Sequence, residues 1–390
     1  MTRVAPVRLA PFADLLGEIV AQNSISASDP VWDNSNEAVI EILKRWFDEL
    51  GFKTLVQDVD KTKGKYNLIA TLGSGNRGLV LAGHTDTVPF DASRWNSDPF
   101  KLHFEQEKFY GLGTCDMKGF FPIIVEALRQ LEGAELTQPL VVIATADEES
   151  SMAGARALAG NASIPARAAV IGEPTSITPI RMHKGIMMES IQFQGRSGHS
   201  SNPDLGNSVV EAVHGFLGEV LAFRTRLQSQ YQNANFAVSG PTLNVGAVHG
   251  GDSPNRICGH CQLNFDLRPL PGMSVESLHA EIAALACQTG YKHAIDVQHR
   301  SLVEAVPAFE TPASSELVEI CEKLTNSDSE AVAFATEAPF LSAMGLDTIV
   351  MGAGSIDQAH QPNEYLATDQ VRGMAQVLSS LIQHYCVKVP

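Results

Sequence analysis

Hydrophobic and polar positions along the first 180 residues switch between helical and strand-like spacing. The segment 36–50 has apolar residues such as Val39 and Leu43 at the spacing of an amphipathic helix. Short apolar runs predict strands at 66–70, 79–82 and 140–144, and helical patterns cover 120–131 and 153–159. Strands that alternate with helices predict an α/β sheet, which binds ligands at the carboxyl ends of its strands.

This pattern changes near residue 182. Strand-like segments at 187–194, 242–248 and 257–267, with helical segments at 207–226 and 275–289, give the order β-α-β-β-α. That order is typical of a small α+β domain whose helices cover an antiparallel sheet. After about residue 300 the α/β pattern returns, with helices predicted at 314–324 and 371–386 and a strand at 348–351.

We therefore expect two domains. Residues 1–182 and 300–390 are expected to form an α/β catalytic domain with a central mixed sheet flanked by helices. Residues 183–299 are expected to form a smaller α+β domain that interrupts it. The length of 390 residues agrees with this division, because a single hydrophobic core rarely serves more than about 250–300 residues.

The composition is that of a globular protein, with 44% hydrophobic and 18% charged residues. A formal net charge of −16 argues against nucleic acid or an anionic membrane as the main partner. No segment approaches the roughly 20 apolar residues that span a bilayer, and the N-terminus lacks a signal-peptide pattern. We therefore expect a cytoplasmic protein.

Six dispersed cysteines agree with reduced thiols. Cys258 and Cys261 form a CxxC pair, which in other contexts indicates a redox or metal site. The period-two alternation across 257–267 instead predicts a half-buried strand that places the two sulfurs on opposite faces. We interpret the pair as ordinary strand cysteines.

Acidic residues and histidines gather after strand-like runs and in loops. They are His84, Asp86, Asp116, Glu148, Glu149, Glu173 and His360. Such a set can hold a pair of divalent metals, and metal-activated water hydrolyses an unactivated amide near neutral pH. Mixed nitrogen and oxygen ligands suit zinc, with cobalt or manganese as substitutes.

Several of these residues have a plainer interpretation when taken singly. His84 and Asp86 could form a strand-end pair in an ordinary turn, Asp116 could cap the helix after it, and His360 could be a solvated loop histidine. Their joint occurrence at strand ends and loops favours a shared site. His360 can join that site only if the middle domain is an insertion.

Glu148 and Glu149 are more specific. Two adjacent carboxylates at a strand end repel each other unless cations neutralise them or one takes up a proton. One of them can bind a metal while its neighbour leans over the bound water, which is the division of roles that metal-assisted hydrolysis needs.

Six stretches closely resemble the M20 family of co-catalytic zinc hydrolases: GHTDTVPFD, GLGTCDMKG, ATADEE, IGEPTS, GRSGHSS and AHQPNEYL. The likeness follows the order of the chain over essentially its whole length. It implies two zinc ions per subunit, with cobalt as a substitute. It also implies a catalytic domain interrupted by a lid or dimerisation domain, and a homodimer formed through that inserted domain.

The resemblance also implies a role for each member of the set. His84 and Glu173 are expected to bind one metal, Glu149 and His360 the other, and Asp116 to bridge the two. Glu148 is expected to be the general base and Asp86 the carboxylate that orients His84.

Further residues are expected to act on the substrate. By the resemblance His199, in GRSGHSS, steadies the oxyanion in the partner subunit's active site, although by itself it reads as a loop histidine. Asn255 and Arg268 are placed in substrate binding, where a planar guanidinium can clasp a carboxylate; the alternative is an exposed strand end. Lys184 is a weaker candidate for the same carboxylate, and Thr336 is expected to line the pocket.

The implied reaction is hydrolysis of N2-acetyl-L-ornithine to L-ornithine and acetate, a step of arginine biosynthesis. Local matches such as TEAPF and GSIDQAHQPNEYL favour this substrate. The alternatives are N-succinyl-diaminopimelate, other N-acyl amino acids and dipeptides. A non-catalytic binding protein of the same fold is a further alternative, against which an intact ligand set with Glu148 argues.

Overall fold

A computed structural model describes residues 2–161 and 164–387, which divide into two compact units. The first unit contains the chain up to Arg181, Thr311–Glu330 and the chain from Thr336 onward. The second unit contains Met182–Glu310 and Ala331–Ala335, so it extends beyond the residues 183–299 expected for the inserted domain. The chain thus leaves the first unit and returns to it.

A mixed sheet forms the centre of the first unit. From β10 to its far edge the order is β10-β17-β9-β4-β8-β3-β2. The bounds are β2 Lys53–Asp60, β3 Lys65–Leu72, β4 Gly78–His84, β8 Leu140–Thr145, β9 Ala166–Pro174, β10 Ile180–His183 and β17 Asp347–Gly352. The strands β17, β9, β4 and β8 are parallel, whereas β10, β3 and β2 pair antiparallel. This arrangement confirms the predicted α/β fold with a central mixed sheet.

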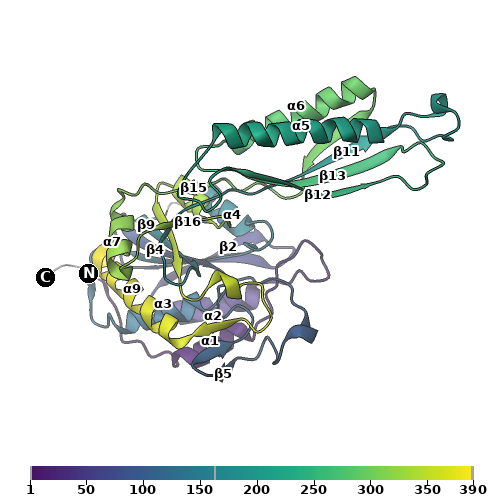
Figure 1. Cartoon of the computed structure of the whole chain (residues 1–390). Helices are drawn as coiled ribbons and strands as arrows, with labels where there is room; N and C mark the ends of the chain where they lie inside the picture. Colours follow the sequence, from purple (N-terminus) through teal and green to yellow (C-terminus); the bar gives the residue numbers. More distant parts are fainter. Residues whose placement is uncertain (1, 162–163, 388–390) are drawn as a thin grey trace. The chain divides into compact units, whose positions relative to one another are not determined.

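Helices cover both faces of this sheet (Figure 1). The larger group shares one hydrophobic core and comprises α1 Phe12–Val20, α2 Glu37–Glu49, α3 Phe120–Arg129, α7 Glu316–Thr325 and α9 Thr368–Cys386. The other group, α4 Ala153–Asn161 and α8 Ala338–Ala343, packs against β3 and β17. Every residue of β4 and β8 is buried, as expected for central parallel strands with helices on both faces.

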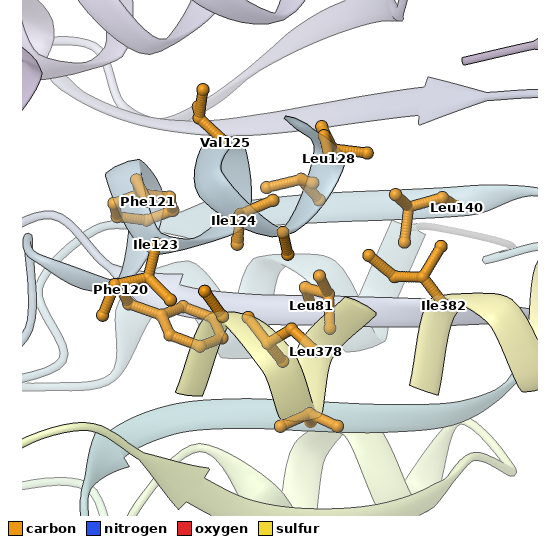
Figure 2. Packing of buried hydrophobic residues seen from close by; sticks show 14 of the residues in the cluster. Leu81, Phe120, Phe121, Ile123, Ile124, Val125, Leu128, Leu140, Leu378 and Ile382 are labelled. Carbon is orange, nitrogen blue, oxygen red and sulfur yellow. The ribbon is translucent and has the colours of Figure 1, made fainter. Parts of the chain in front are cut away.

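The core places α3 and α9 directly over β4 and β8. Figure 2 shows Ile124 and Leu128 of α3 beside Leu81 of β4, with Leu378 and Ile382 of α9 packed next to them. All five side chains are fully buried. Removing one such side chain typically costs about 2–5 kcal/mol, so this packing fixes the strands whose ends carry the candidate site.

The start of α3 also needs a glycine on the neighbouring strand. A Cβ at Gly172 of β9 would lie 2.2 Å from the ring of Phe120, closer than packed atoms tolerate. Gly172 therefore lets α3 approach the end of β9, directly beside Glu173.

A small antiparallel sheet lies beside this core in the first unit. It consists of β5 His103–Glu105, β6 Lys108–Tyr110 and β18 Tyr365–Ala367. Pairing of β18 with β6 places the loop after β6 next to the loop before β18, and the N–H of Gly111 donates to the carbonyl of Glu364 at 3.1 Å.

The second unit is an antiparallel sheet with two helices. Its strands are β11 Met187–Gln194, β12 Thr242–Gly250, β13 His260–Arg268 and β14 Asp296–Ser301, in the order β12-β13-β11-β14. The helices α5 Val209–Gln230 and α6 Val275–His293 cover one face (Figure 1). Each begins at a capping serine, Ser208 or Ser274, whose hydroxyl accepts a backbone N–H.

Other short strands are β1 Thr2–Arg3, β7 Glu135–Leu136, β15 Phe309–Glu310 and β16 Glu330–Val332. Across the described ranges, no helix is both long and apolar enough to cross a membrane.

One predicted strand begins later than expected. The pattern predicts a strand from 257, but β13 starts at His260, so Cys258 precedes it while Cys261 lies within it. The reason is the backbone pairing of 257–259. The N–H of Ile257 donates to Gly198, and the carbonyl of Gly259 accepts from Gly195, so this segment pairs with a loop rather than with β12.

Candidate metal centre

Three neighbouring strands of the first unit end in residues that can bind a metal. His84 is the last residue of β4, Glu173 lies next to the end of β9, and Glu148 and Glu149 follow closely after β8. Because β9, β4 and β8 are adjacent and parallel, their carboxyl ends meet at one edge of the sheet. Open α/β sheets bind ligands at this edge.

Two loops of the same unit complete the group. Asp116 lies between β6 and α3, and His360 lies shortly before β18. The carboxylate of Glu364 accepts the backbone N–H of Gly113 at 2.9 Å, of Cys115 at 2.7 Å and of Asp116 at 2.9 Å. Glu364 therefore holds the backbone that carries Asp116 against the loop that carries His360.

Asp116 lies between two imidazoles. Its Oδ1 is 3.2 Å from His84 Nε2, and its Oδ2 is 3.5 Å from His360 Nε2. Glu173 Oε1 lies 4.0 Å from His84 Nε2, and Glu149 Oε1 lies 3.0 Å from His360 Nε2. Two groups of potential ligands share Asp116, each with its ligand atoms within 4.8 Å of one another, and a third such group joins His84 with Glu148 and Glu149.

Asp86 contacts both His84 and the turn after β8. Its main-chain oxygen is 3.0 Å from His84 Nδ1, while its carboxylate Oδ1 is 3.6 Å away. A carbonyl only accepts hydrogen bonds, so Nδ1 carries a proton, and Nε2 is the ring nitrogen that faces Asp116. The carboxylate of Asp86 accepts the N–H of Glu148 at 3.2 Å and of Glu149 at 3.0 Å.

A buried ion-pair network supports this turn from behind. Lys65 is 1% exposed and donates to Asp147 at 2.6 Å and to Asp33 at 2.7 Å. Asp147 directly precedes Glu148 and has a left-handed backbone with φ of 58°, which few residues other than glycine adopt readily. The hydroxyl of Ser26 also donates to Asp147 at 2.9 Å.

Burial of many carboxylates shifts their pKa values upward. Burial, reinforced by Glu173, raises the pKa of Glu148 well above its ordinary value, and burial does the same to Glu173. Burial also raises the pKa of Glu337 to about 7. Burial would raise the pKa of Asp116 as well, but hydrogen bonds with His360 and His84 outweigh it and lower that pKa. The upward shifts of Glu148, Glu173 and Glu337 reflect the cost of burying negative charge, which a cation would offset.

The residues present fit metal ions. Glu173 Oε1 is buried and has no hydrogen-bond partner within residues 2–161 and 164–387, which is costly for a carboxylate oxygen. The donor set combines imidazole nitrogens with carboxylate oxygens, as zinc prefers. The two ligand groups share Asp116, whose two oxygens face different imidazoles, so the arrangement suits a pair of ions.

Most residues predicted to contact the substrate lie in the second unit. His199 is exposed, and its Nδ1 lies 2.7 Å from the hydroxyl of Ser201. Asn255 is exposed and accepts a hydrogen bond from Ser253 at 2.5 Å. Arg268 ends β13, where its Nε donates to Asp266 at 2.9 Å.

Lys184 and Thr336 are buried. Lys184, in the second unit, donates to the carbonyls of Val238 at 2.9 Å and Gly240 at 2.6 Å, and burial lowers its pKa. Thr336 lies in the first unit, where its hydroxyl accepts the N–H of Ala338 at 3.1 Å at the start of α8.

Glu364 was not among the predicted site residues. It lies in the stretch DQAHQPNEY, where the sequence shows a polar loop and gives no sign that this one carboxylate is buried. The signal that could have indicated Glu364 is its position, directly before a short strand and close to His360. A buried carboxylate at such a position can accept hydrogen bonds from the backbone of a neighbouring loop.

Comparisons with known proteins agree with this geometry. The profile of Peptidase family M20/M25/M40 matches residues 80–384. The acetylornithine deacetylase of Proteus mirabilis (strain HI4320) is 44% identical over 385 residues, covering 98% of each chain. That of Klebsiella pneumoniae (strain 342) is 45% identical over 378 residues, covering 97% of this chain and 98% of its own. An M20 family metallo-carboxypeptidase from Sulfolobus solfataricus has the same fold, with a TM-score of 0.74 at 17% identity, covering 97% of this chain and 99% of its own.

Proposed function

Because this chain belongs to peptidase family M20/M25/M40, we propose that it hydrolyses N2-acetyl-L-ornithine to L-ornithine and acetate, a step of arginine biosynthesis. The choice of this substrate rests on one observation: the chain is 44% and 45% identical to acetylornithine deacetylases along nearly their whole length. The buried carboxylates and imidazoles around Asp116 support the chemistry of a metal-dependent amidohydrolase.

In this proposal the site holds two zinc ions, with cobalt as a substitute. His84 and Glu173 would hold one ion, Glu149 and His360 would hold the other, and both ions would share Asp116. When bound, such ions lower the pKa of a water molecule and polarise the amide carbonyl.

Glu148 moves the proton of the reaction. It takes a proton from the attacking water and returns it to the α-amine of ornithine as the amide bond breaks. Its position directly beside the proposed ligand Glu149, in the turn after β8, supports this role.

Neighbouring residues orient these groups. Asp86 holds the backbone N–H groups of Glu148 and Glu149, which sets the turn on which base and ligand lie. Its main-chain carbonyl fixes the tautomer of His84. Thr336 lines the substrate pocket, next to Glu337.

The second unit acts as the lid and dimerisation domain of a cytoplasmic homodimer. His199 steadies the oxyanion, and Asn255 and Arg268 bind the substrate. The guanidinium of Arg268 carries several N–H donors in a plane that matches a carboxylate. Lys184 has a smaller part, because two of its three N–H donors are engaged by backbone carbonyls.

Substrate kinetics test the proposal. The ratio kcat/KM is measured for N-acetylornithine, N-succinyl-diaminopimelate, N-acetylmethionine and a dipeptide with the zinc-loaded protein. We expect N-acetylornithine to lead by about 10-fold or more, since the chain is 44% and 45% identical to acetylornithine deacetylases and enzymes separate substrates by their kcat/KM. A higher kcat/KM for another compound would make that compound the substrate instead of N-acetylornithine. Absence of activity on all four compounds would contradict the proposal that the protein is an amidohydrolase.

A further inference from the structure

Strand β11 in the second unit carries a carboxylate in an otherwise apolar row. Met187, Ile191 and Phe193 occupy alternate positions of β11 and are buried in the core of this unit. Glu189 stands between them at 0% exposure. A carboxylate that is buried in such a row is costly unless a cation or several hydrogen-bond donors offset its charge.

Two histidines and a serine surround this carboxylate. Oε2 of Glu189 lies 2.7 Å from His299 Nε2 and 3.7 Å from His279 Nδ1. The hydroxyl of Ser301 lies 3.1 Å from both carboxylate oxygens. The cluster shares no residue with the candidate metal centre of the first unit.

Regular elements hold these side chains in place. Ser301 and His299 lie on β14, which pairs with β11 so that Ser301 is directly opposite Glu189. His279 comes from α6, which packs on β14. Sites on strands and helices keep their geometry better than sites on loops.

We propose that Glu189, His279 and His299 bind a divalent transition-metal ion, with Zn²⁺ as the best-fitting candidate. In a tetrahedral site with ligand distances of about 2.1 Å, the ligand atoms lie about 3.4 Å apart. The separations of 2.7 and 3.7 Å bracket that value, and the three ligand atoms lie within 4.8 Å of one another. Two imidazoles and one carboxylate are a common zinc ligand set, with water as a fourth ligand.

His299 and Ser301 meet the carboxylate directly. The side chain of His299 is 5% exposed, and its Nε2 is the ring nitrogen that lies next to Glu189, so Nε2 is the atom that a metal would use. Ser301 donates to Glu189, as partners of metal-bound carboxylates commonly do.

The cluster has an entry path for an ion. His279 and His299 line a groove of about 700 Å³ between α6 and β14, together with residues such as Cys287 and Tyr291. The side chain of His279 is 45% exposed, so it connects buried Glu189 with solvent.

A simpler arrangement needs no metal, because one protonated imidazole would also offset the charge of Glu189. The two imidazole rings lie only 4.3 Å apart between centroids, so protonation of both would place like charges together. A single divalent ion uses both nitrogen lone pairs and neutralises the carboxylate. The arrangement with a protonated imidazole contains no zinc, whereas the proposed site contains one zinc ion, so the measured zinc content decides between them.

The test is equilibrium dialysis of the full chain against buffered micromolar Zn²⁺, followed by metal analysis. The variants are His279→Gln and Glu189→Gln, with His214→Gln as a matched control because His214 is exposed on α5 of the same unit. We expect the wild-type protein and His214→Gln to bind one zinc ion per chain more than His279→Gln and Glu189→Gln. Zinc should also raise the unfolding temperature of wild type more than that of His279→Gln.

Equal zinc content in wild type and His279→Gln would overturn the proposal, and so would a difference seen only at millimolar zinc. His279 is half-exposed on a helix, so its variant is expected to fold, which circular dichroism verifies. If Glu189→Gln fails to fold, His279→Gln decides alone. Amidase activity plays no part in the readout.

Discussion

Two adjacent residues of this protein meet different partners. Glu149 Oε1 lies 3.0 Å from His360 Nε2, whereas the strongest electrostatic neighbours of Glu148 are Glu173 and His84. The backbone of both is held by one carboxylate, that of Asp86. The proposed ligand Glu149 and the proposed base Glu148 are thus adjacent in sequence but face different groups.

This division predicts distinct variants. Glu148→Gln should lower kcat by about 10²–10⁴-fold, the usual contribution of a general base, while zinc content stays close to that of wild type. Glu149→Gln should instead lower zinc content, because it removes the charge of a ligand. Metal analysis and turnover of N-acetylornithine measure both quantities. Normal turnover in Glu148→Gln would reject it as the base.

The sequence made most of these residues predictable because each follows a strand-like run or a glycine-rich loop. His84 and Glu173 lie at the carboxyl ends of apolar strands, and the sheet brings their positions together. Glu364 was not predictable in this way, because its burial depends on backbone N–H groups almost 250 residues away. The family resemblance seen in the sequence is confirmed by the match over residues 80–384.

One carboxylate, that of Glu364, holds two loops of the first unit together. Glu364 accepts three backbone N–H groups from 113–116 and thereby joins the loop of Asp116 to the loop of His360. Without it, these N–H groups would be buried unpaired, which is unfavourable.

Replacing Glu364 should therefore weaken metal binding. Glu364→Gln keeps the size of the side chain but replaces one accepting oxygen by an N–H₂ group, so it cannot accept all three N–H groups. We expect zinc affinity to fall by about 10–100-fold, as for other residues that orient metal ligands, without loss of the fold. Competition with a chromophoric chelator measures the affinity. Exposed Glu105 of β5 gives the control Glu105→Gln, and equal affinities in the two variants would contradict the role.

Elements with long periodic patterns were predictable, and polar edge strands were not. The helix α2 and the strand β11 fall at or within one residue of their predicted ends. The strands β2 and β14 were missed, because the sequences KTLVQDVD and DVQHRS are largely polar. Both lie at a sheet edge, where hydrogen bonds to one neighbour form the strand without an apolar face.

At the scale of the whole molecule, metal binding should couple to the stability of the first unit. Its buried carboxylates repel each other in the absence of cations, and ions that bind the folded site favour folding. We expect chelation to lower the unfolding temperature of this unit, and added zinc to restore it. The unfolding temperature is measured by calorimetry on the His279→Gln variant, because this variant lacks the zinc site proposed in the second unit. An unchanged transition after complete chelation would contradict the coupling.

The second unit should respond to pH through His183. This residue is fully buried, stacks on Phe309 with ring centroids 5.2 Å apart, and has Nδ1 2.8 Å from the carbonyl of Lys184. Burial lowers the pKa of His183 from 6.5 to about 4. Between these values the unfolded chain binds a proton that the folded chain does not, so stability falls as the pH falls from 6.5 to 4.

The expected loss across this interval is about 3 kcal/mol, because each pKa unit corresponds to about 1.4 kcal/mol. His183→Asn keeps a donor for the carbonyl of Lys184 but cannot bind the proton, so its stability should depend less on pH in this window. The control is His214→Asn, since exposed His214 should leave the wild-type dependence unchanged. Unfolding temperatures of the three proteins are compared from pH 4 to 8. Parallel curves for wild type and His183→Asn would show that another group causes the acid lability of this unit.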